Sequence, residues 1–408
     1  MRKVKLEDLC SDIIDCPHTT PKWQTRGIPV IRNFNLHNRY INLDGSDISY
    51  VDEATYHQRI KRATPEPGDI VISREAPMGV VGLIPEGMKC CMGQRLVLLK
   101  VNRIKCNPVY LLHALTSEYV QTQIRRIDTR GSIVSNIDLD TLRELEIPII
   151  DGQEEAADLL DSISRKIETN TKVIAELESL ARTIYDYWFT QFDFPDEHGN
   201  PYRSSGGAMV HNEALHRDIP KDWGTIHLRE IVDLVDDKCS HIGLSVDNYI
   251  STDNMLKKRG GICPSAYLPV EGRVTRFQQN DILLSNIRPY FKKIWLSDRI
   301  GGCCADVLVF RAKHREHTEW LYQTMAADPF FSYVSIGAKG SKMPRGDKEH
   351  MMRYPVAMPP KELLCVFSKL YSPMHNQIAK LYKENIHLAN LRDWLLPLLM
   401  NGQATIDK

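Results

Sequence analysis

The chain contains 408 residues, and a usual domain size of roughly 100–200 residues predicts two or three domains. Apolar residues make up 42% of the sequence, but no stretch approaches the ~20 apolar residues of a membrane helix, which argues against a membrane-spanning protein. Lysine plus arginine and aspartate plus glutamate number 52 each, so no large positive charge indicates nucleic-acid binding. Binding to DNA would require basic residues gathered on one face, or a partner subunit that supplies part of the surface.

The N-terminus and the cysteines predict a cytoplasmic protein. No apolar run follows the basic residues of segment 1–8, which therefore does not resemble a signal peptide. Ten cysteines occur without a Cys-x-x-Cys pair, which favours reduced thiols over a disulfide framework. Adjacent cysteines also lack the ligand spacing of common metal sites, so we expect no metal.

In chain order, the first 151 residues predict a mixed α/β module. We expect a helix over 5–14 and another over 109–124, which Asn107-Pro108 begins. Short apolar runs bounded by Gly, Pro and Asn predict strands at 28–31, 69–73, 80–84, 95–101 and 145–150. A loop that contains Arg130-Gly131-Ser132 separates the second helix from the last strand.

A long helix follows this module. From Ala156 to Trp188, apolar residues alternate spacings of four and three, as in a coiled-coil seam, with one polar break at Asn170. The stretch from Phe367 to Leu399 repeats this pattern, with polar breaks at Asn385 and Arg392. Full antiparallel overlap of the two seams would place the asparagines opposite each other, where buried amides typically fix register. Pro373 leaves an alternative, in which the second helix begins there and the overlap is shorter.

The two modules are copies of one domain. The run PGDIVISR at 67–74 reappears as QNDILLSN at 279–286, and the same offset carries Cys91 onto Cys303. The segment 190–207 between the copies is rich in Gly, Pro and Ser, so we expect a hinge there. The predicted fold class is therefore mixed α/β (α+β). It has two globular domains, each followed by a long helix, and the helices pack as an antiparallel coiled coil with pseudo-twofold symmetry.

Several motifs resemble one known family. YDYWFTQFDFP at 185–195, YRSSGG at 202–207 and IPKDW at 219–223 closely resemble the central region of type I restriction-modification specificity subunits. YISTDNM at 249–255 and DILLSNIRPY at 281–290 extend the resemblance over essentially the whole chain.

The resemblance implies two target-recognition domains that each read one half of a split DNA site, with helices that set the spacing. It divides the chain into target-recognition domain 1 (1–151), a central helical spacer (152–190), a linker (191–224), target-recognition domain 2 (225–360) and a distal helical spacer (361–408). It also implies a non-catalytic chain that binds double-stranded DNA and two methyltransferase subunits, which a restriction subunit can join. S-adenosylmethionine for adenine-N6 methylation would then lie in the methyltransferase, and this chain would bind no cofactor.

Two other classes of protein share some of these features. A free-standing bipartite DNA-binding regulator or phage-defence protein would have the same duplicated frame without methyltransferase partners. A two-module scaffold that binds proteins would need no DNA. The balanced charge favours DNA binding with a partner over the free-standing regulator.

Candidate DNA-binding residues are those of polar or basic loops that occur in both copies. We expect DNA contacts from the early loops, from the turns after the repeated strand and from the Gly-Ser loops. In the first copy these are Arg32, Asn33, Arg74, Arg130, Ser132 and Asn136; in the second they are Ser251, Asn254, Asn286, Arg288, Lys292, Lys339, Ser341, Lys342 and Arg345. Tyr185 and Tyr187 lie off the helical seam, which favours them as contacts for a methyltransferase subunit.

Overall fold

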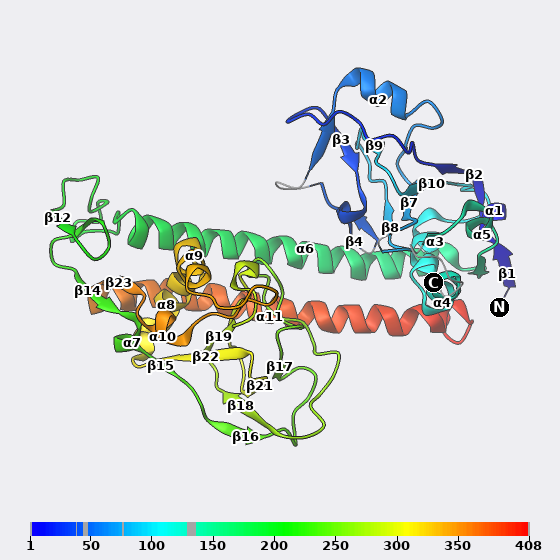
Figure 1. The fold of residues 1–408 in the computed structure, drawn as a ribbon. Helices are drawn as coiled ribbons and strands as arrows, with labels where there is room; N and C mark the ends of the chain where they lie inside the picture. Colours follow the sequence, from blue (N-terminus) through cyan, green and yellow to red (C-terminus); the bar gives the residue numbers. More distant parts are fainter. Residues whose placement is uncertain (1, 38, 44–47, 76, 129–135, 407–408) are drawn as a thin grey trace. The chain divides into compact units, whose positions relative to one another are not determined.

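The computed structural model describes residues 2–37, 39–43, 48–75, 77–128 and 136–406. The chain forms two compact units (Figure 1). Unit 1 comprises Met1–Asn170 and Glu384–Lys408, and unit 2 comprises Thr171–Lys383. Two long helices, α6 (Gln153–Tyr185) and α11 (Lys361–Met400), contribute residues to both units. None of the described helices is both long and apolar enough to cross a bilayer.

Unit 1 is built on a four-stranded sheet of order β2-β10-β7-β8. All four residues of β7 and five of six in β10 are buried, which explains why these strands read as unbroken apolar runs. A three-stranded sheet, β6-β3-β9, and two strand pairs, β1-β11 and β4-β5, complete the unit. The strands are β1 (Arg2–Lys5), β2 (Cys10–Asp15), β3 (Ile28–Ile31), β4 (Leu36–His37), β5 (Tyr40–Ile41), β6 (Ser49–Val51), β7 (Ile70–Ser73), β8 (Val81–Leu83), β9 (Cys91–Met92), β10 (Leu96–Val101) and β11 (Glu146–Ile149).

The prediction of a helix over 5–14 is wrong for most of this segment. Only α1 (Leu6–Leu9) is helical, and the chain then continues as β2. Ile13 and Ile14 are β-branched, and they pair with Leu99 and Leu98 of β10, which stabilises a strand rather than a helix. The other helices of unit 1 are α2 (Glu53–Arg59), α3 (Pro108–Leu115), α4 (Glu118–Asp128) and α5 (Leu139–Arg143). The single helix expected over 109–124 is thus two, α3 and α4.

Unit 2 repeats this arrangement with a sheet of order β15-β22-β19-β20, a strand pair β14-β23 and a four-stranded sheet β16-β18-β21-β17. Its strands are β12 (Met209–Asn212), β13 (Arg217–Pro220), β14 (Gly224–His227), β15 (Val232–Leu234), β16 (Lys238–Ser240), β17 (Tyr249–Ile250), β18 (Arg273–Phe277), β19 (Ile282–Ser285), β20 (Ile294–Leu296), β21 (Gly301–Cys303), β22 (Val307–Ala312) and β23 (Pro355–Met358). Its helices are α7 (Leu228–Ile231), α8 (Thr318–Ala326), α9 (Asp328–Ile336) and α10 (Lys348–Met352).

The duplication extends to individual contacts inside the two units. In unit 1, Asp69 forms an ion pair with Lys100 at 2.8 Å, and in unit 2 Asp281 forms one with Arg311 at 2.7 Å. Cys91 pairs in parallel with Val30, and Cys303 pairs in parallel with Ile250. Equivalent strands therefore make equivalent pairings, although few side chains are identical. The sheet that differs in strand number is the one that carries these cysteines.

The linker 191–224, which contains nearly all of the hinge predicted at 190–207, is folded and is not a hinge. Phe192, Ile219 and Trp223 are buried in the main core of unit 2, and β12 pairs with β13 as a hairpin. Asp193 accepts hydrogen bonds from the backbone N–H and the hydroxyl of Ser204, both at 2.7 Å. Aromatic burial outweighs the flexibility that the glycines and serines of this segment indicate.

Within unit 1, α6 and α11 run antiparallel. Leu160 of α6 shares a core with Leu396 and Leu399, which lie near the end of α11. The Nδ2 of Asn170, which is 2% exposed, donates to Oδ1 of Asn385 at 2.9 Å and to Glu384 at 3.1 Å. The asparagines thus lie opposite each other, as antiparallel overlap of the two seams requires.

The same antiparallel pairing occurs within unit 2, where Ile174 of α6 packs with Ile378 and Leu381 of α11. Helix α11 runs unbroken past Pro373, which excludes the shorter overlap. The hydroxyls of Ser368 and Ser372, in the turn before this proline, both donate to the buried carboxylate of Glu319, at 3.1 and 2.8 Å.

The paired amides lead to a stability prediction. Asn170→Ala should lower the free energy of unfolding by about 1–3 kcal/mol, because it removes the two hydrogen bonds that the buried Asn170 amide donates to half-buried groups of α11. Replacing both asparagines by leucine should recover that loss but weaken the preference for a single register. Urea unfolding measures the first effect, and cysteine crosslinking between the helices measures the second. An Ala variant as stable as the wild type would contradict this role.

Candidate nucleic-acid interface

Two of the predicted loops of unit 2 form one continuous surface. The turn after β19 and the Gly-Ser loop before α10 are joined by backbone hydrogen bonds. The Arg288 N–H donates to the Pro344 carbonyl at 2.8 Å, and the Gly346 N–H donates to the Asn286 carbonyl at 3.1 Å. Lys339 and Arg345 exchange two further backbone bonds, at 2.8 and 2.9 Å, that close the loop into a narrow hairpin. Residues 56 to 60 positions apart in sequence therefore present their side chains together.

Exposed cations lie along this hairpin, and carboxylates hold two of them. Lys339 pairs with Asp347 at 2.5 Å and lowers the pKa of that carboxyl to about 2. Arg345 pairs with Asp306 at 3.0 Å. Ser341 and Lys342 lie exposed at the tip, and Lys342 makes no ion pair with any described residue. The hairpin thus combines a free cation with two cations that a phosphate could take over from a carboxylate.

A second basic segment, Lys257-Lys258-Arg259, joins this surface and was not predicted. The N–H groups of Lys258 and Arg259 donate to the carbonyls of Phe291 and Lys292, both at 2.8 Å. Arg259 and Lys292 both form ion pairs with Asp328. Lys292 and Arg259 together lower the pKa of that carboxyl to about 2. The run of three basic residues could have indicated a DNA contact from sequence alone, but it lies outside the motifs shared by the two copies.

In unit 1 the equivalent turn is held closed by internal bonds. Arg74 is mostly buried and donates to the Ile137 carbonyl and to Asp15, both at 2.8 Å. The Ile137 N–H donates to the Arg74 carbonyl at 3.1 Å, the counterpart of the Gly346 bond in unit 2. Asn136 is exposed beside it, whereas Arg130 and Ser132 lie outside the described residues. Arg74 therefore orders the turn, and of the described residues Asn136 is the better placed for DNA.

The early loops share one buried asparagine but differ at the surface. Asn35 accepts from the Arg32 N–H at 3.0 Å, and Asn254 accepts from the Ser251 N–H at 2.7 Å, directly after equivalent strands. Both Ser251 and Asn254 are buried, and Asn254 also donates to two backbone carbonyls, Tyr249 and Cys263. We predicted that Ser251 and Asn254 contact DNA. In the structure both residues are buried and instead shape the turn through their hydrogen bonds.

Arg32, at the position of Ser251, reaches the surface of unit 1. Its guanidinium lies 5.0 Å from the ring of Trp23 and 4.7 Å from the ring of Phe34, and both rings are exposed. Exposed aromatic rings around a guanidinium are a common nucleic-acid-binding arrangement. Asn33 is half-buried and donates to the Glu75 carbonyl at 2.5 Å, which leaves it a smaller exposed surface.

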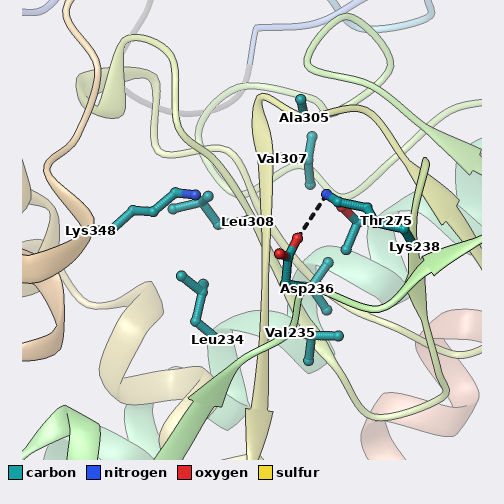
Figure 2. A pocket seen from close by; sticks show the side chains of 10 residues that line it. Leu234, Val235, Asp236, Lys238, Thr275, Ala305, Val307, Leu308 and Lys348 are labelled. Carbon is teal, nitrogen blue, oxygen red and sulfur yellow. Dashed lines mark hydrogen bonds and ion pairs between the residues drawn. The ribbon is translucent and has the colours of Figure 1, made fainter. Parts of the chain in front are cut away.

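A cavity of about 170 Å³ in unit 2 lies between β15, β18 and β22 (Figure 2). Lys238, on one side of it, bonds to Asp236 at 2.9 Å and to Thr275 at 2.8 Å, while Lys348 lines the opposite side. This volume is well below the ~300 Å³ of common ligand pockets and suits a few water molecules. Among the described residues, no group of three His, Cys, Asp or Glu side chains is arranged to hold a metal ion.

The prediction that Tyr185 contacts a partner is wrong. Tyr185 is buried in the core of unit 2, where its hydroxyl bonds to Thr324 at 3.0 Å and desolvation raises its pKa. Here α6 packs against the domain core as well as α11, so its buried face is wider than a two-helix seam. Tyr187 lies in the π-helical turn Asp186–Thr190 that ends the helix and is 39% exposed, so it remains a candidate contact.

Comparison with known proteins agrees with this architecture. Residues 1–179 match the family of the type I restriction modification DNA specificity domain. The type I restriction enzyme MjaIX specificity subunit of Methanocaldococcus jannaschii is 22% identical over 365 residues, covering 84% of this chain and 78% of the relative. The putative type I restriction enzyme MjaX specificity subunit of the same organism is 23% identical over 409 residues, with coverages of 93% and 88%.

A solved structure has the same fold. The type I restriction-modification S subunit from M. genitalium is 16% identical, covers 97% of this chain and 94% of its own, and superposes with a TM-score of 0.56. The chain therefore has the fold of that S subunit, with mixed α/β units and long antiparallel helices. Residues 1–179 thus carry the type I restriction modification DNA specificity domain, and the whole chain is similar to type I restriction enzyme specificity subunits.

The free cation of the hairpin gives a binding prediction. Lys342→Ala should weaken binding to duplex DNA and reduce the slope of log affinity against log salt by about 1, because one phosphate contact is lost. Lys221→Ala, at an exposed lysine of the segment 191–224, is the matched control. Fluorescence anisotropy at several salt concentrations measures the slope. An unchanged slope for Lys342→Ala would remove the hairpin tip from the interface.

The carboxylate next to Arg345 gives a prediction of opposite sign. Asp306→Asn keeps the side-chain shape but releases Arg345, so non-specific duplex binding should tighten and its salt slope should steepen by about 1. Asp218→Asn, which removes an exposed carboxylate on β13, is the control. Weaker binding by Asp306→Asn would show instead that the ion pair holds Arg345 in its binding position.

Proposed function

We propose that each unit reads one half of a bipartite DNA site and that α6 and α11 set the distance between the halves. The observation that carries this proposal is a repeated scaffold with different loops. The ion pairs of Asp69 and Asp281 recur in the two units. The loops attached to this scaffold differ, because Arg32 stands where unit 2 has Ser251. Two readers with different surfaces fit a site whose halves have different sequences.

The basic surface of unit 2 supports DNA as the ligand. Its hairpin and neighbouring turn carry lysine and arginine side chains on rigid, hydrogen-bonded backbone, which is suited to contacts with phosphates and base edges. Because the whole chain carries no net charge, this local concentration matters more than total charge. The carboxylates beside the cations would limit non-specific binding, since phosphates must displace them.

The proposal assigns catalysis to other subunits. The chain would recruit two adenine-N6 methyltransferase subunits, which bind S-adenosylmethionine, and in restriction complexes a nuclease subunit. It would itself bind no cofactor and would act in the cytoplasm, where its DNA lies. Tyr187 is the candidate contact for a methyltransferase subunit, because it is an exposed aromatic side chain at the end of α6.

Co-expression with the methyltransferase subunit tests this function. We expect a complex of two methyltransferase chains and one specificity chain, and N6-methyladenine in a split motif when the DNA of the expressing cells is sequenced. A solitary protein with no salt-sensitive affinity for duplex DNA would contradict the proposal. Methylation at a single undivided motif would contradict the assignment of one half-site to each unit.

Tyr185 and Tyr187 allow an effect on assembly to be distinguished from an effect on folding. Tyr187→Ala should leave thermal unfolding nearly unchanged and reduce co-purification of the methyltransferase, because its ring is exposed. Tyr185→Ala should destabilise unit 2 by about 3–5 kcal/mol, because it removes a fully packed ring from the core. Calorimetry and pull-down assays measure the two effects. Undiminished co-purification by Tyr187→Ala would exclude it from the docking surface.

A further inference from the structure

The turn between β19 and β20 has an unusual backbone. A single 3-10 turn, η3 (Pro289–Phe291), is preceded by Arg288 with φ 50° and followed by Lys292 with φ 51°. Lys258 and Arg259, with φ of 56° and 63°, lie against it. Four residues other than glycine thus adopt the left-handed conformation in one small region. Such conformations persist where the surrounding structure fixes them, and they concentrate at functional sites.

Backbone hydrogen bonds hold this turn from both sides. Phe291 and Lys292 accept from the segment 257–259, and Arg288 donates to Pro344 of the hairpin. Asn286, at the start of the turn, is 9% exposed, and its Oδ1 has no hydrogen-bond partner in the described part of the chain. The Nε of Arg288 is likewise buried and has no such partner there. The turn is therefore rigid and retains one unused acceptor and one unused donor.

The turn presents an aromatic side chain to solvent. Tyr290 is 53% exposed, and its ring packs edge-on against Phe291 with centroids 4.8 Å apart. Phe291 in turn lies under the ammonium of Lys257, at 4.3 Å, and near the guanidinium of Arg288, at 5.9 Å. Met343, 50% exposed, precedes the Pro344 that bonds to Arg288. Two large apolar side chains thus project from a surface rich in cations.

This chemistry fits nucleic acid better than a protein partner. Aromatic rings next to lysine and arginine stack on bases while the cations contact phosphates. Protein interfaces instead are depleted of lysine, whereas Lys257, Lys258 and Lys292 lie next to this turn. The equivalent stretch of unit 1, residues 74–80, has the sequence REAPMGV and contains no aromatic residue. Unit 2 therefore carries a feature that unit 1 lacks.

We propose that Tyr290, supported by Met343, forms a wedge that stacks on or between bases of the half-site read by unit 2. Arg288 and Lys257 contact the phosphates on either side. One half-site is then distorted on binding and the other is not. Base steps that unstack readily favour such a wedge, so it contributes specificity without hydrogen bonds to every base. The proposal rests on the proposed function, because it requires DNA at unit 2.

The test uses the complex with its methyltransferase subunits and a duplex of the methylated motif. 2-Aminopurine is placed in turn at each position of each half other than the methylated adenines and their neighbours, because a methyltransferase flips its target base out of the duplex. We expect a fluorescence increase at one step in one half only. Tyr290→Ala should abolish this increase and weaken duplex binding about 10-fold, whereas Tyr290→Phe should retain both. Lys342→Ala is the matched control, because it should weaken binding while the fluorescence increase remains.

Three results would overturn the wedge. The wild-type complex could give no fluorescence increase at any position, or Tyr290→Ala could retain an increase that the wild type gives. Tyr290→Ala could also lose the methyltransferase subunits while the free chain still binds duplex DNA normally, which would make Tyr290 a protein contact. Absence of any split methylation motif for the wild type is a separate result, because it contradicts the proposed function itself. Tyr290 is exposed, so the variants should unfold at the wild-type temperature, which calorimetry checks.

Discussion

The hydrogen bond between the side chains of Asn170 and Asn385 is the constraint on which the proposed function depends most. Asn170 is buried, and a buried amide costs free energy unless it is bonded, so the register that places Asn385 opposite it is favoured. Ile174, Ile378 and Leu381 continue the same antiparallel pairing within unit 2. If α6 and α11 were free to slide, they could not define one spacing between half-sites.

Features that the two units share and features that differ between them lie in different parts of each unit. Shared features are buried and hydrogen-bonded: the asparagines Asn35 and Asn254 after equivalent strands, and the backbone bonds of Ile137 and Gly346. Differences lie at the surface. Unit 1 presents Arg32 between two aromatic rings, whereas unit 2 presents a basic hairpin beside a strained turn. One scaffold can thus carry two different recognition surfaces.

The features that follow from local periodicity could be predicted from the sequence. The seams of α6 and α11, their antiparallel pairing and the repeated strands β7 and β19 depend on apolar spacing, which the sequence displays directly. The failures depend on tertiary context. Residues 10–15 form a strand because β10 lies beside them, and Tyr185 is buried because a whole domain packs on that face of α6. The segment 191–224 is folded because its aromatic side chains reach the core of unit 2.

The candidate site was predictable only in part, for the same reason. The polarity of the loops indicated Arg345 and Lys342 as DNA contacts. It could not show that Ser251 and Asn254 are buried by the hydrogen bonds of their turn, or that Arg74 orders its own turn. The segment 257–259 joins the interface through backbone bonds to residues more than 30 positions away, which no local pattern encodes.

Lengthening both helices by one matched heptad tests the central claim most directly. Duplicating residues 171–177 in α6 and 378–384 in α11 keeps the seam in phase and adds roughly 10 Å at ~1.5 Å per residue. The methylated motif of cells that express the complex should keep both half-sites, while the gap between them lengthens by about 3 base pairs. An unchanged gap with both half-sites intact would show that the helices do not set the spacing.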